Sequence, residues 1–294
     1  MKKYSDGGVS MRMRTSLLSK AFQTVNITFI ILLCLTVLLP IWMVVITSLS
    51  SNEVAAREGF VLIPKGIEFT SYISVFTTGG YSRAFIRSIW ITVVSTAVSM
   101  MISTTMAYAL SRKELIWRNG FVNIVFLTMI VDGGIIPFYM VVRNLGMIDT
   151  YWSLIIPTAV STYNLILMRN FFRSIPDNLI ESARLDGCGE LGILTRIVLP
   201  VSIPILAAVT LFYAVNHWNR YFEVVMFINS TSKTTLQVLL RQLIFHSEGD
   251  GTYSVLLNNF KMAVMVIAML PNLLLYPFIQ KYFISGLMLG SIKG

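Results

Sequence analysis

The sequence predicts an all-α, polytopic membrane protein with six transmembrane helices. Of the 294 residues, 55% are hydrophobic and only 13% are charged, whereas a soluble domain carries about a quarter charged residues. The mean hydropathy is +0.72. Stretches of about 20 apolar residues can cross the hydrocarbon core of a membrane as helices. Six such stretches are the predicted spans: residues 25–48, 85–110, 120–142, 152–171, 201–226 and 262–283.

The first span is predicted to be a retained helix rather than a signal peptide. Basic residues precede it, as they precede a signal peptide, but its apolar run is too long and no small-residue cleavage site follows. Residues 1–24 then form a basic N-terminal arm. This arm is either a short interfacial helix or a disordered segment.

The distribution of basic residues predicts that both termini lie in the cytoplasm. Six spans place both ends on one side, and the short connection 111–119 holds Arg112, Lys113 and Arg118 against Glu114. Short loops rich in Lys and Arg face the cytoplasm. The same orientation gives outer loops at 49–83 and 229–260, a cytoplasmic loop at 172–200 and a cytoplasmic tail at 285–294.

The net charge of +9 does not predict nucleic-acid binding, because the basic residues flank apolar spans instead of clustering on a polar domain. Cys34 and Cys188 imply no disulfide framework. The sequence contains no G-x-x-x-x-G-K-[ST] phosphate loop, no H-E-x-x-H and no G-x-S-x-G motif. We therefore expect no catalytic residue, no metal ligand and no cofactor bound by this chain.

Small hydroxyl residues recur at helical spacing along the second span. They are Ser88, Thr92, Ser95, Thr96, Ser99 and Ser103. Such residues let helix backbones approach and hydrogen-bond where no hydrophobic force joins helices. We favour helix packing here over a solute-lining role.

The third span contains a carboxylate, Asp132, followed by two glycines and Pro137. A carboxylate at membrane depth is energetically costly and is a candidate functional residue. The glycines and the proline can break the helix beside protein or a water-filled cavity. Asp132 and Tyr139 are therefore candidates for a solute pathway. Alternatively, Asp132 lies near the outer end of the span and pairs with an arginine such as Arg143.

A polar and aromatic run ends the fifth span. Its candidate pathway residues are Asn216, His217, Trp218, Asn219 and Glu223. Saccharide sites stack sugar faces on aromatic rings and pair hydroxyls with amides and carboxylates. The same composition is found in membrane-interface belts, which are rich in Trp and Tyr, and Arg220 and Glu223 can also satisfy each other at i and i+3.

The segment between the fourth and fifth spans is too charged to stay in lipid. Pro176 and Asp177 predict the start of a helix. Ile180, Ala183 and Gly187 then share a small, apolar face, and Gly187 can end the helix. A second short helix is expected at about 189–197. Glu181, Arg184 and Asp186 are expected to lie toward the other face of the first helix.

The pattern in this segment closely resembles a family signature, the EAA loop of importer permeases in the ATP-binding cassette superfamily. The residues that carry it are Glu181, Ala183, Asp186, Gly187, Ile197, Leu199 and Pro200. Ser182 replaces the usual alanine at the second position, and both are small. The resemblance implies a type I ABC importer permease fold in which this loop docks on an ATPase subunit. An ordinary amphipathic connector is the alternative interpretation.

The resemblance covers about residues 20–294 and is strongest for the carbohydrate-uptake branch, including its C-terminal tail. It implies a second, homologous permease subunit, two ATPase subunits that use ATP and Mg, an extracytoplasmic solute-binding protein and a saccharide substrate. The chain would lie in the cytoplasmic (inner) membrane of a bacterium. The runs at 133–137 and 217–219 look like those of permeases for oligosaccharides and polysaccharide fragments, such as alginate or other uronate polymers.

Other function classes stay open at this point. A secondary transporter or channel needs no ATPase, but it would show inverted repeats or a polar filter, and no convincing repeat is present. A membrane-embedded enzyme would need a catalytic spacing that the acids and His217 do not form. A homodimeric permease for another solute is a further alternative.

Overall fold

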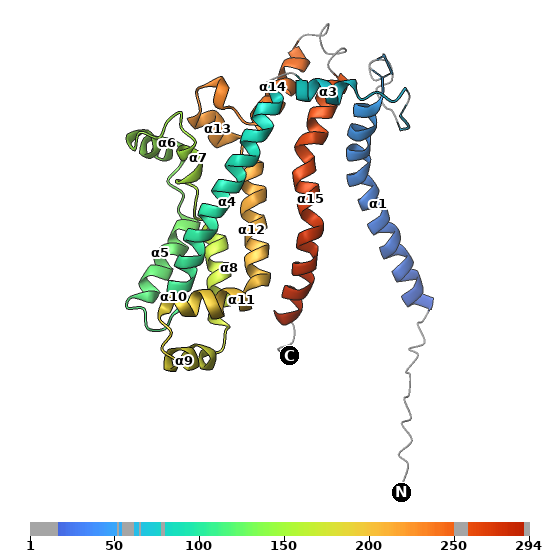
Figure 1. Ribbon diagram of the computed structural model, residues 1–294. Coiled ribbons are helices and arrows are strands. Elements are labelled where there is room, and N and C mark those ends of the chain that lie inside the picture. The colour runs from blue at the N-terminus through green and yellow to red at the C-terminus, as the bar shows by residue number, and fades with distance from the viewer. Residues whose placement is uncertain are drawn as a thin grey trace.

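Three long helices form the frame of the protein. The computed structural model describes residues 17–51, 53–54, 62–64, 66–77, 80–249 and 258–290. The long helices in this part of the chain are α1 (Leu17–Leu49), α4 (Tyr81–Ser111) and α15 (Asn258–Gly290) (Figure 1). Each contains a stretch long and apolar enough to cross a membrane. They contain the first, second and sixth predicted spans.

Shorter helices fill the rest of the described chain, in which no strand occurs. In chain order they are α3 (Thr70–Thr77), α5 (Arg118–Ile130), α6 (Ile135–Asn144), α7 (Trp152–Ile155), α8 (Thr162–Arg173), α9 (Asp177–Leu185), α10 (Glu190–Ile193), the π-helix η1 (Leu194–Val198), α11 (Leu199–Val201), α12 (Ile203–Trp218), α13 (Phe222–Phe227), the 3-10 turn η2 (Thr231–Lys233) and α14 (Leu236–Gly249). The predicted all-α class is confirmed.

The third predicted span, 120–142, is not one straight helix. It is divided into α5 and α6, which are bent by 117° to each other. The break lies at Asp132 and the two glycines, where Gly134 has a φ of +83°. This backbone angle is accessible to glycine at little cost. The predicted break is therefore confirmed, whereas the continuous span is corrected.

The fourth and fifth predicted spans, 152–171 and 201–226, are also interrupted. Between α7 and α8 the chain leaves the helix at Pro157, and Ser161 starts α8 by accepting a hydrogen bond from the Asn164 N–H at 3.5 Å. The Ser161 N–H donates to the Tyr213 hydroxyl at 3.0 Å, so protein satisfies this non-helical backbone. The fifth span ends earlier than expected, because α12 stops at Trp218 and α13 begins after a break.

The boundaries of the end segments also differ from the prediction. Helix α1 begins at Leu17, within the predicted 1–24 arm, and α15 continues through the predicted tail as far as Gly290. The rest of the arm and of the tail lies outside the described residues, as do parts of both predicted outer loops.

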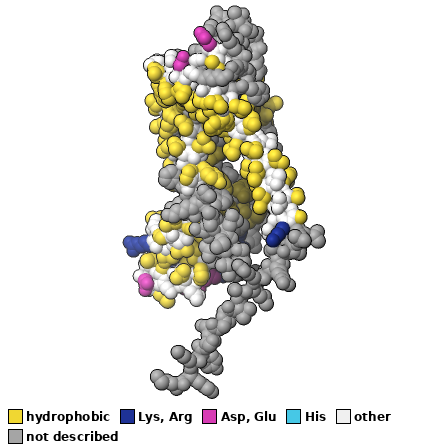
Figure 2. Space-filling model, turned by 90° about the vertical axis from the view of Figure 1, so that its right-hand side faces the viewer, with side chains coloured by type: hydrophobic (Ala, Val, Ile, Leu, Met, Phe, Trp, Pro, Cys, Tyr) yellow, Lys and Arg dark blue, Asp and Glu magenta, His cyan; other side chains and the backbone are white. Residues whose placement is uncertain are grey.

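Apolar side chains cover much of the outer surface between two polar ends. Figure 2 shows hydrophobic side chains over the middle of one face, with the visible Lys, Arg, Asp and Glu side chains toward its two ends. Helix α9 lies at one end of the molecule and α14 at the other (Figure 1). We refer to these as the α9 end and the α14 end. This pattern fits a protein whose middle is in contact with lipid.

The small hydroxyl residues of α4 pack against other helices, as predicted. Ser99 Oγ lies 3.1 Å from His217 Nε2, and Ser103 Oγ lies 2.6 Å from the Tyr213 hydroxyl, so both bond to α12. The stripe residues that are buried are Ser88, Ser95, Thr96, Ser99 and Ser103. Helix α4 is in this way joined to α12 along its length.

We expect Ser103→Leu to destabilise the protein and Thr105→Leu to have little effect. Ser103 is fully buried, so a larger side chain would overpack the α4–α12 contact and remove a hydrogen bond, costing about 3 kcal/mol. Thr105 is exposed on the same helix, and its hydroxyl bonds only to carbonyls of that helix. Thermal unfolding of the purified chain in mild detergent measures both variants, and equal losses would contradict the packing role.

Candidate functional site

The sequence of α9 determines where the helix begins and ends. Pro176 stands immediately before it, and Asp177 places a carboxylate in the first turn, at the positive end of the helix dipole. At its other end the Gly187 N–H donates to the Arg184 carbonyl at 3.0 Å, and the Cys188 N–H donates to the Ala183 carbonyl at 2.9 Å. These two bonds form a Schellman motif. Gly187 adopts a φ of +81°, which favours glycine at this position.

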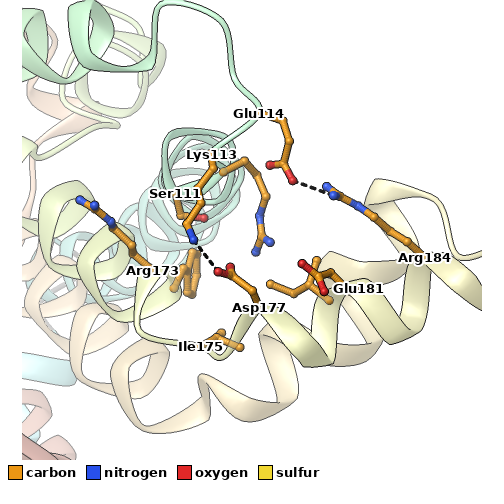
Figure 3. A pocket seen from close by; sticks show the side chains of 11 residues that line it. Ser111, Lys113, Glu114, Arg173, Ile175, Asp177, Glu181 and Arg184 are labelled. Carbon is orange, nitrogen blue, oxygen red and sulfur yellow. Dashed lines mark hydrogen bonds and ion pairs between the residues drawn. The ribbon is translucent and has the colours of Figure 1, made fainter.

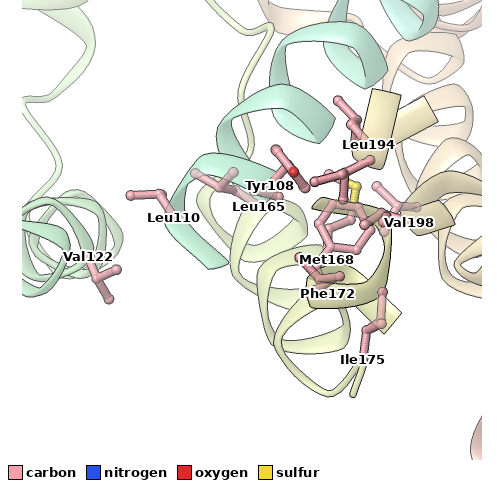
Figure 4. Packing of buried hydrophobic residues seen from close by; sticks show 14 of the residues in the cluster. Tyr108, Leu110, Val122, Leu165, Met168, Phe172, Ile175, Leu194 and Val198 are labelled. Atoms are coloured by element: carbon pink, nitrogen blue, oxygen red, sulfur yellow. The ribbon is translucent and has the colours of Figure 1, made fainter. Parts of the chain in front are cut away.

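One face of α9 is anchored in the protein. Ile180 and Ala183 are buried and belong to a hydrophobic cluster contributed by α4, α5, α8, α9, α12 and the segment after α9. Figure 4 shows Phe172 of α8 close to Val198 in this cluster. Burying such side chains stabilises the packing by roughly 25 cal/mol per Å² of apolar surface. The cluster therefore fixes α9 to the helices of the membrane domain.

The opposite face of α9 is open. Glu181 and Asp186 are exposed, and Leu185 is 89% exposed. A Cβ at Gly187 would meet no atom within 4 Å. Leu185, Glu181 and Asp186 therefore leave the outer part of α9 accessible.

Ion pairs hold the sides of α9. Arg184 bonds to Glu114 at 2.6 Å and to Glu190 at 2.8 Å, and Lys113 bonds to Asp177 at 2.5 Å. Figure 3 shows two of these pairs bridging α9 and the α4–α5 connection across a small polar hollow, which Glu181 also lines. The α9 helix is thus tied to α4 and to α10 as well as to α8.

The charge states of this network are well defined near neutral pH. The hydrogen bond from the Tyr108 hydroxyl (2.5 Å) and the contact with Arg184 lower the pKa of Glu190, and the hydrogen bond from Arg184 lowers the pKa of Glu114. Both carboxylates therefore favour the folded loop above their ordinary pKa. This contribution is lost only as the pH falls through the lowered values.

The segment after α9 connects the loop rigidly to α12. Ile197 lies in the π-helical turn η1, and Leu199 and Pro200 lie in α11, with Ile197 and Leu199 half-buried against the same cluster. The stretch Glu190–Val201 is bent by 86° to α12. The bend is centred on the buried Ser202, whose N–H donates to the Val198 carbonyl at 3.0 Å. The predicted second helix is present and is longer than expected.

Asp132 and Tyr139 lie away from the loop, at the α5–α6 break and on α6. Asp132 is exposed, and its Oδ1 accepts a hydrogen bond from the Gly134 N–H at 3.0 Å. No ion pair to Arg143 forms in the part of the chain that the structure describes. The Tyr139 ring stacks on Phe227, with centroids 6.2 Å apart. The carboxylate stays accessible, whereas the tyrosine is partly used in packing.

The polar run at the end of α12 divides between two faces. His217 and Trp218 are buried: His217 bonds to Ser99 and Arg220, and the Trp218 indole donates to the Ala268 carbonyl at 2.9 Å. In this conformation the Trp218 ring is not exposed for sugar stacking. The pathway candidates that line an open hollow are Asn216, Asn219 and Glu223.

Within the described residues, no group of three His, Cys, Asp or Glu side chains could hold a metal ion. The polar chemistry instead concentrates at the α9 loop and at the α14 end. The described chain is thus an all-helical domain with several apolar helices and a short, exposed loop helix at one end. This architecture is that of a membrane-spanning transport permease.

Comparison with known proteins identifies the family. Residues 5–288 match the family described as binding-protein-dependent transport system inner membrane component. The chain belongs to this family and is the permease type of subunit of an ABC importer.

Individual relatives agree with this assignment. The chain is 42% identical to the polygalacturonan/rhamnogalacturonan transport system permease protein YtcP of Bacillus subtilis (strain 168), over 94% of this chain and 99% of that one. It is 29% identical to the arabinooligosaccharides transport system permease protein AraQ of Halalkalibacterium halodurans, over 97% and 100%. A chain of a crystallised bacterial ABC transporter involved in the import of the acidic polysaccharide alginate superposes with a TM-score of 0.86 and 31% identity, covering 91% of this chain and 98% of that one.

We expect Arg184→Ala to loosen α9. Exposed ion pairs contribute about 0.2–1 kcal/mol each, so losing two should raise the opening frequency of α9 roughly five-fold. Hydrogen exchange of the amides of α9 at one fixed pH measures this change. Arg173→Ala is the matched control, because Arg173 lines the same hollow without forming an ion pair to a described residue. Equal exchange rates in the two variants would contradict the role of Arg184.

Proposed function

We propose that the chain is the membrane-spanning subunit of an ATP-driven importer for acidic oligosaccharides derived from polymers such as polygalacturonan or alginate. The proposal for the substrate is supported by the relatives of the chain, which include a permease for polygalacturonan and rhamnogalacturonan and a chain of an alginate importer. Asn216, Asn219 and Glu223, which line the open hollow at the end of α12, provide amides and a carboxylate suited to sugar hydroxyls.

The energy for transport comes from a separate chain. This sequence has no phosphate loop, so two ATPase subunits, using ATP and Mg, bind at the α9 end. The α9 end faces the cytoplasm together with both termini, in the inner membrane of a bacterium. A second, homologous permease completes the pathway, and a solute-binding protein delivers the saccharide at the α14 end.

The observation that carries this mechanism is the attachment of α9 on one side and its exposure on the other. Glu181, Leu185, Asp186 and Gly187 meet a groove of the ATPase. Closure of the two ATPases on ATP draws the α9 helices of the two permeases together. Because the buried cluster and the ion pairs of Arg184 fix α9 to α4, α8 and α12, these helices move with it. The cavity between the permeases then changes from inward-facing to outward-facing.

We expect Glu181→Lys and Gly187→Trp each to abolish uptake while leaving the chain in the membrane. Glu181 is exposed and forms no ion pair to a described residue, so its reversal removes none of the ion pairs that hold α9. A pull-down of the tagged chain in mild detergent should recover the second permease and the ATPase from the wild type. The ATPase alone should be lost from both variants.

Glu68→Lys is the matched control, because this exposed carboxylate lies outside the α9 loop. It should retain the ATPase. Recovery of the wild-type chain alone, or only with itself, would contradict the proposed assembly and favour a secondary transporter. Normal uptake by either α9 variant would contradict the docking role.

A further inference from the structure

Two neighbouring hollows lie at the end of α12, beside α13 and α14. One, of about 770 Å³, is lined by the end of α12 and by α13. The other, of about 340 Å³, is lined by α14, with Gln237 and Phe245 among its residues. Asn219 and Tyr221 line both. The two hollows are therefore neighbours, and their combined volume offers room for more than one sugar unit.

The smaller hollow carries a single formal charge. Its lining residues, all within the described chain, are Asn219, Tyr221, Gln237, Leu240, Arg241, Ile244 and Phe245. Arg241 is the one ionised side chain among them, and no carboxylate of the lining neutralises it. The lining of this hollow is therefore positive, and an anion entering it gains Coulombic energy from Arg241. The carboxylate of Glu223 lies in the lining of the larger hollow instead.

Two aromatic rings hold the guanidinium of Arg241 in place. Its central carbon lies 4.6 Å from the centroid of the Tyr221 ring and 5.3 Å from that of Phe245. Cation–π contacts of this kind fix the plane of the group and leave its N–H donors free. No described residue accepts a hydrogen bond from Arg241, so this fork of donors is available to a ligand.

Arg220 lines the larger hollow, but its guanidinium makes its contacts inside the protein. It is buried, and it donates to the Leu154 carbonyl and lies in hydrogen-bonding contact with His217 Nδ1. Its contacts connect α12 to α7 inside the protein. Arg241 is exposed and has no such internal partner. Arg220 therefore stabilises the fold, whereas Arg241 faces the smaller hollow.

We propose that Arg241 binds the carboxylate of a uronate unit in the transported saccharide. The guanidinium is planar and presents paired donors that match a carboxylate in bidentate geometry. Gln237 and Asn216 supply amides for the hydroxyls, and the exposed edge of Phe245 supplies an apolar contact for the sugar ring. This assignment rests on the proposed function and adds the residue that distinguishes an acidic saccharide from a neutral one.

The test compares an acidic ligand with its neutral form in the complete transporter. Uptake of a galacturonate oligomer and of its methyl ester is measured in proteoliposomes that contain both permeases and the ATPases, with the solute-binding protein supplied. Loss of one charge-assisted contact should raise the half-saturating concentration for the acid roughly ten-fold in Arg241→Gln. Arg241→Lys keeps the positive charge but not the paired donors, so its half-saturating concentration for the acid should lie between those of the wild type and Arg241→Gln. Uptake of the ester should be weaker than that of the acid and unchanged by Arg241→Gln.

Arg143→Gln is the matched control, because Arg143 is an exposed arginine of α6 that lines neither hollow. It should behave as the wild type. Equal losses for acid and ester in Arg241→Gln would overturn the inference and indicate a contact with the solute-binding protein. Unchanged uptake of the acid would also overturn it. If the wild-type transporter carries neither oligomer, the proposed function fails instead.

Discussion

Helix α9 is attached to the helices of the membrane domain by an apolar contact and by ion pairs. Ile180 and Ala183 provide the apolar part of this contact, and Arg184 provides the polar part through Glu114 and Glu190. Exposed ion pairs alone are weak, so the buried cluster supplies most of the stability. The ion pairs fix the orientation of the helix. Both contacts together couple α9 to the helices that contribute to the cluster.

Much of the α9 loop could be predicted from the sequence, because its signals are local. Pro176 and Asp177 indicated the start of the helix, Gly187 indicated its end, and the apolar spacing indicated its buried face. The partners of Arg184 could not be predicted, since Glu114 lies 70 positions away. The connection that holds Glu114 was interpreted only through its basic residues, as a sign of topology. Arg241 was missed for the same reason, because its two ring contacts come from separate segments.

The number of apolar stretches was a good guide to the fold class but a poor guide to helix continuity. Hydropathy is averaged over a window of residues. Short breaks in a helix, such as those near Pro157 and after Trp218, therefore leave the average unchanged. The composition of the polar run at 216–223 fits a saccharide site and a membrane-interface belt equally. A helix instead distributes neighbouring residues around its axis, and His217 and Trp218 turn into the protein while Asn216 and Asn219 turn out. Composition shows that such a run is polar, but only the packing decides which members face solvent.

The segment Glu190–Val201 and α12 meet at Ser202 at an angle of 86°. If this joint stays rigid, a displacement of Glu190–Val201 tilts α12 as well. Helix α12, with its 16 residues, is about 24 Å long, so a tilt of roughly 10° would carry its far end about 4 Å sideways. Asn216 lies near that far end, and Asn219 directly follows the helix. A motion of the loop would in this way reach the residues that line the hollow at the end of α12.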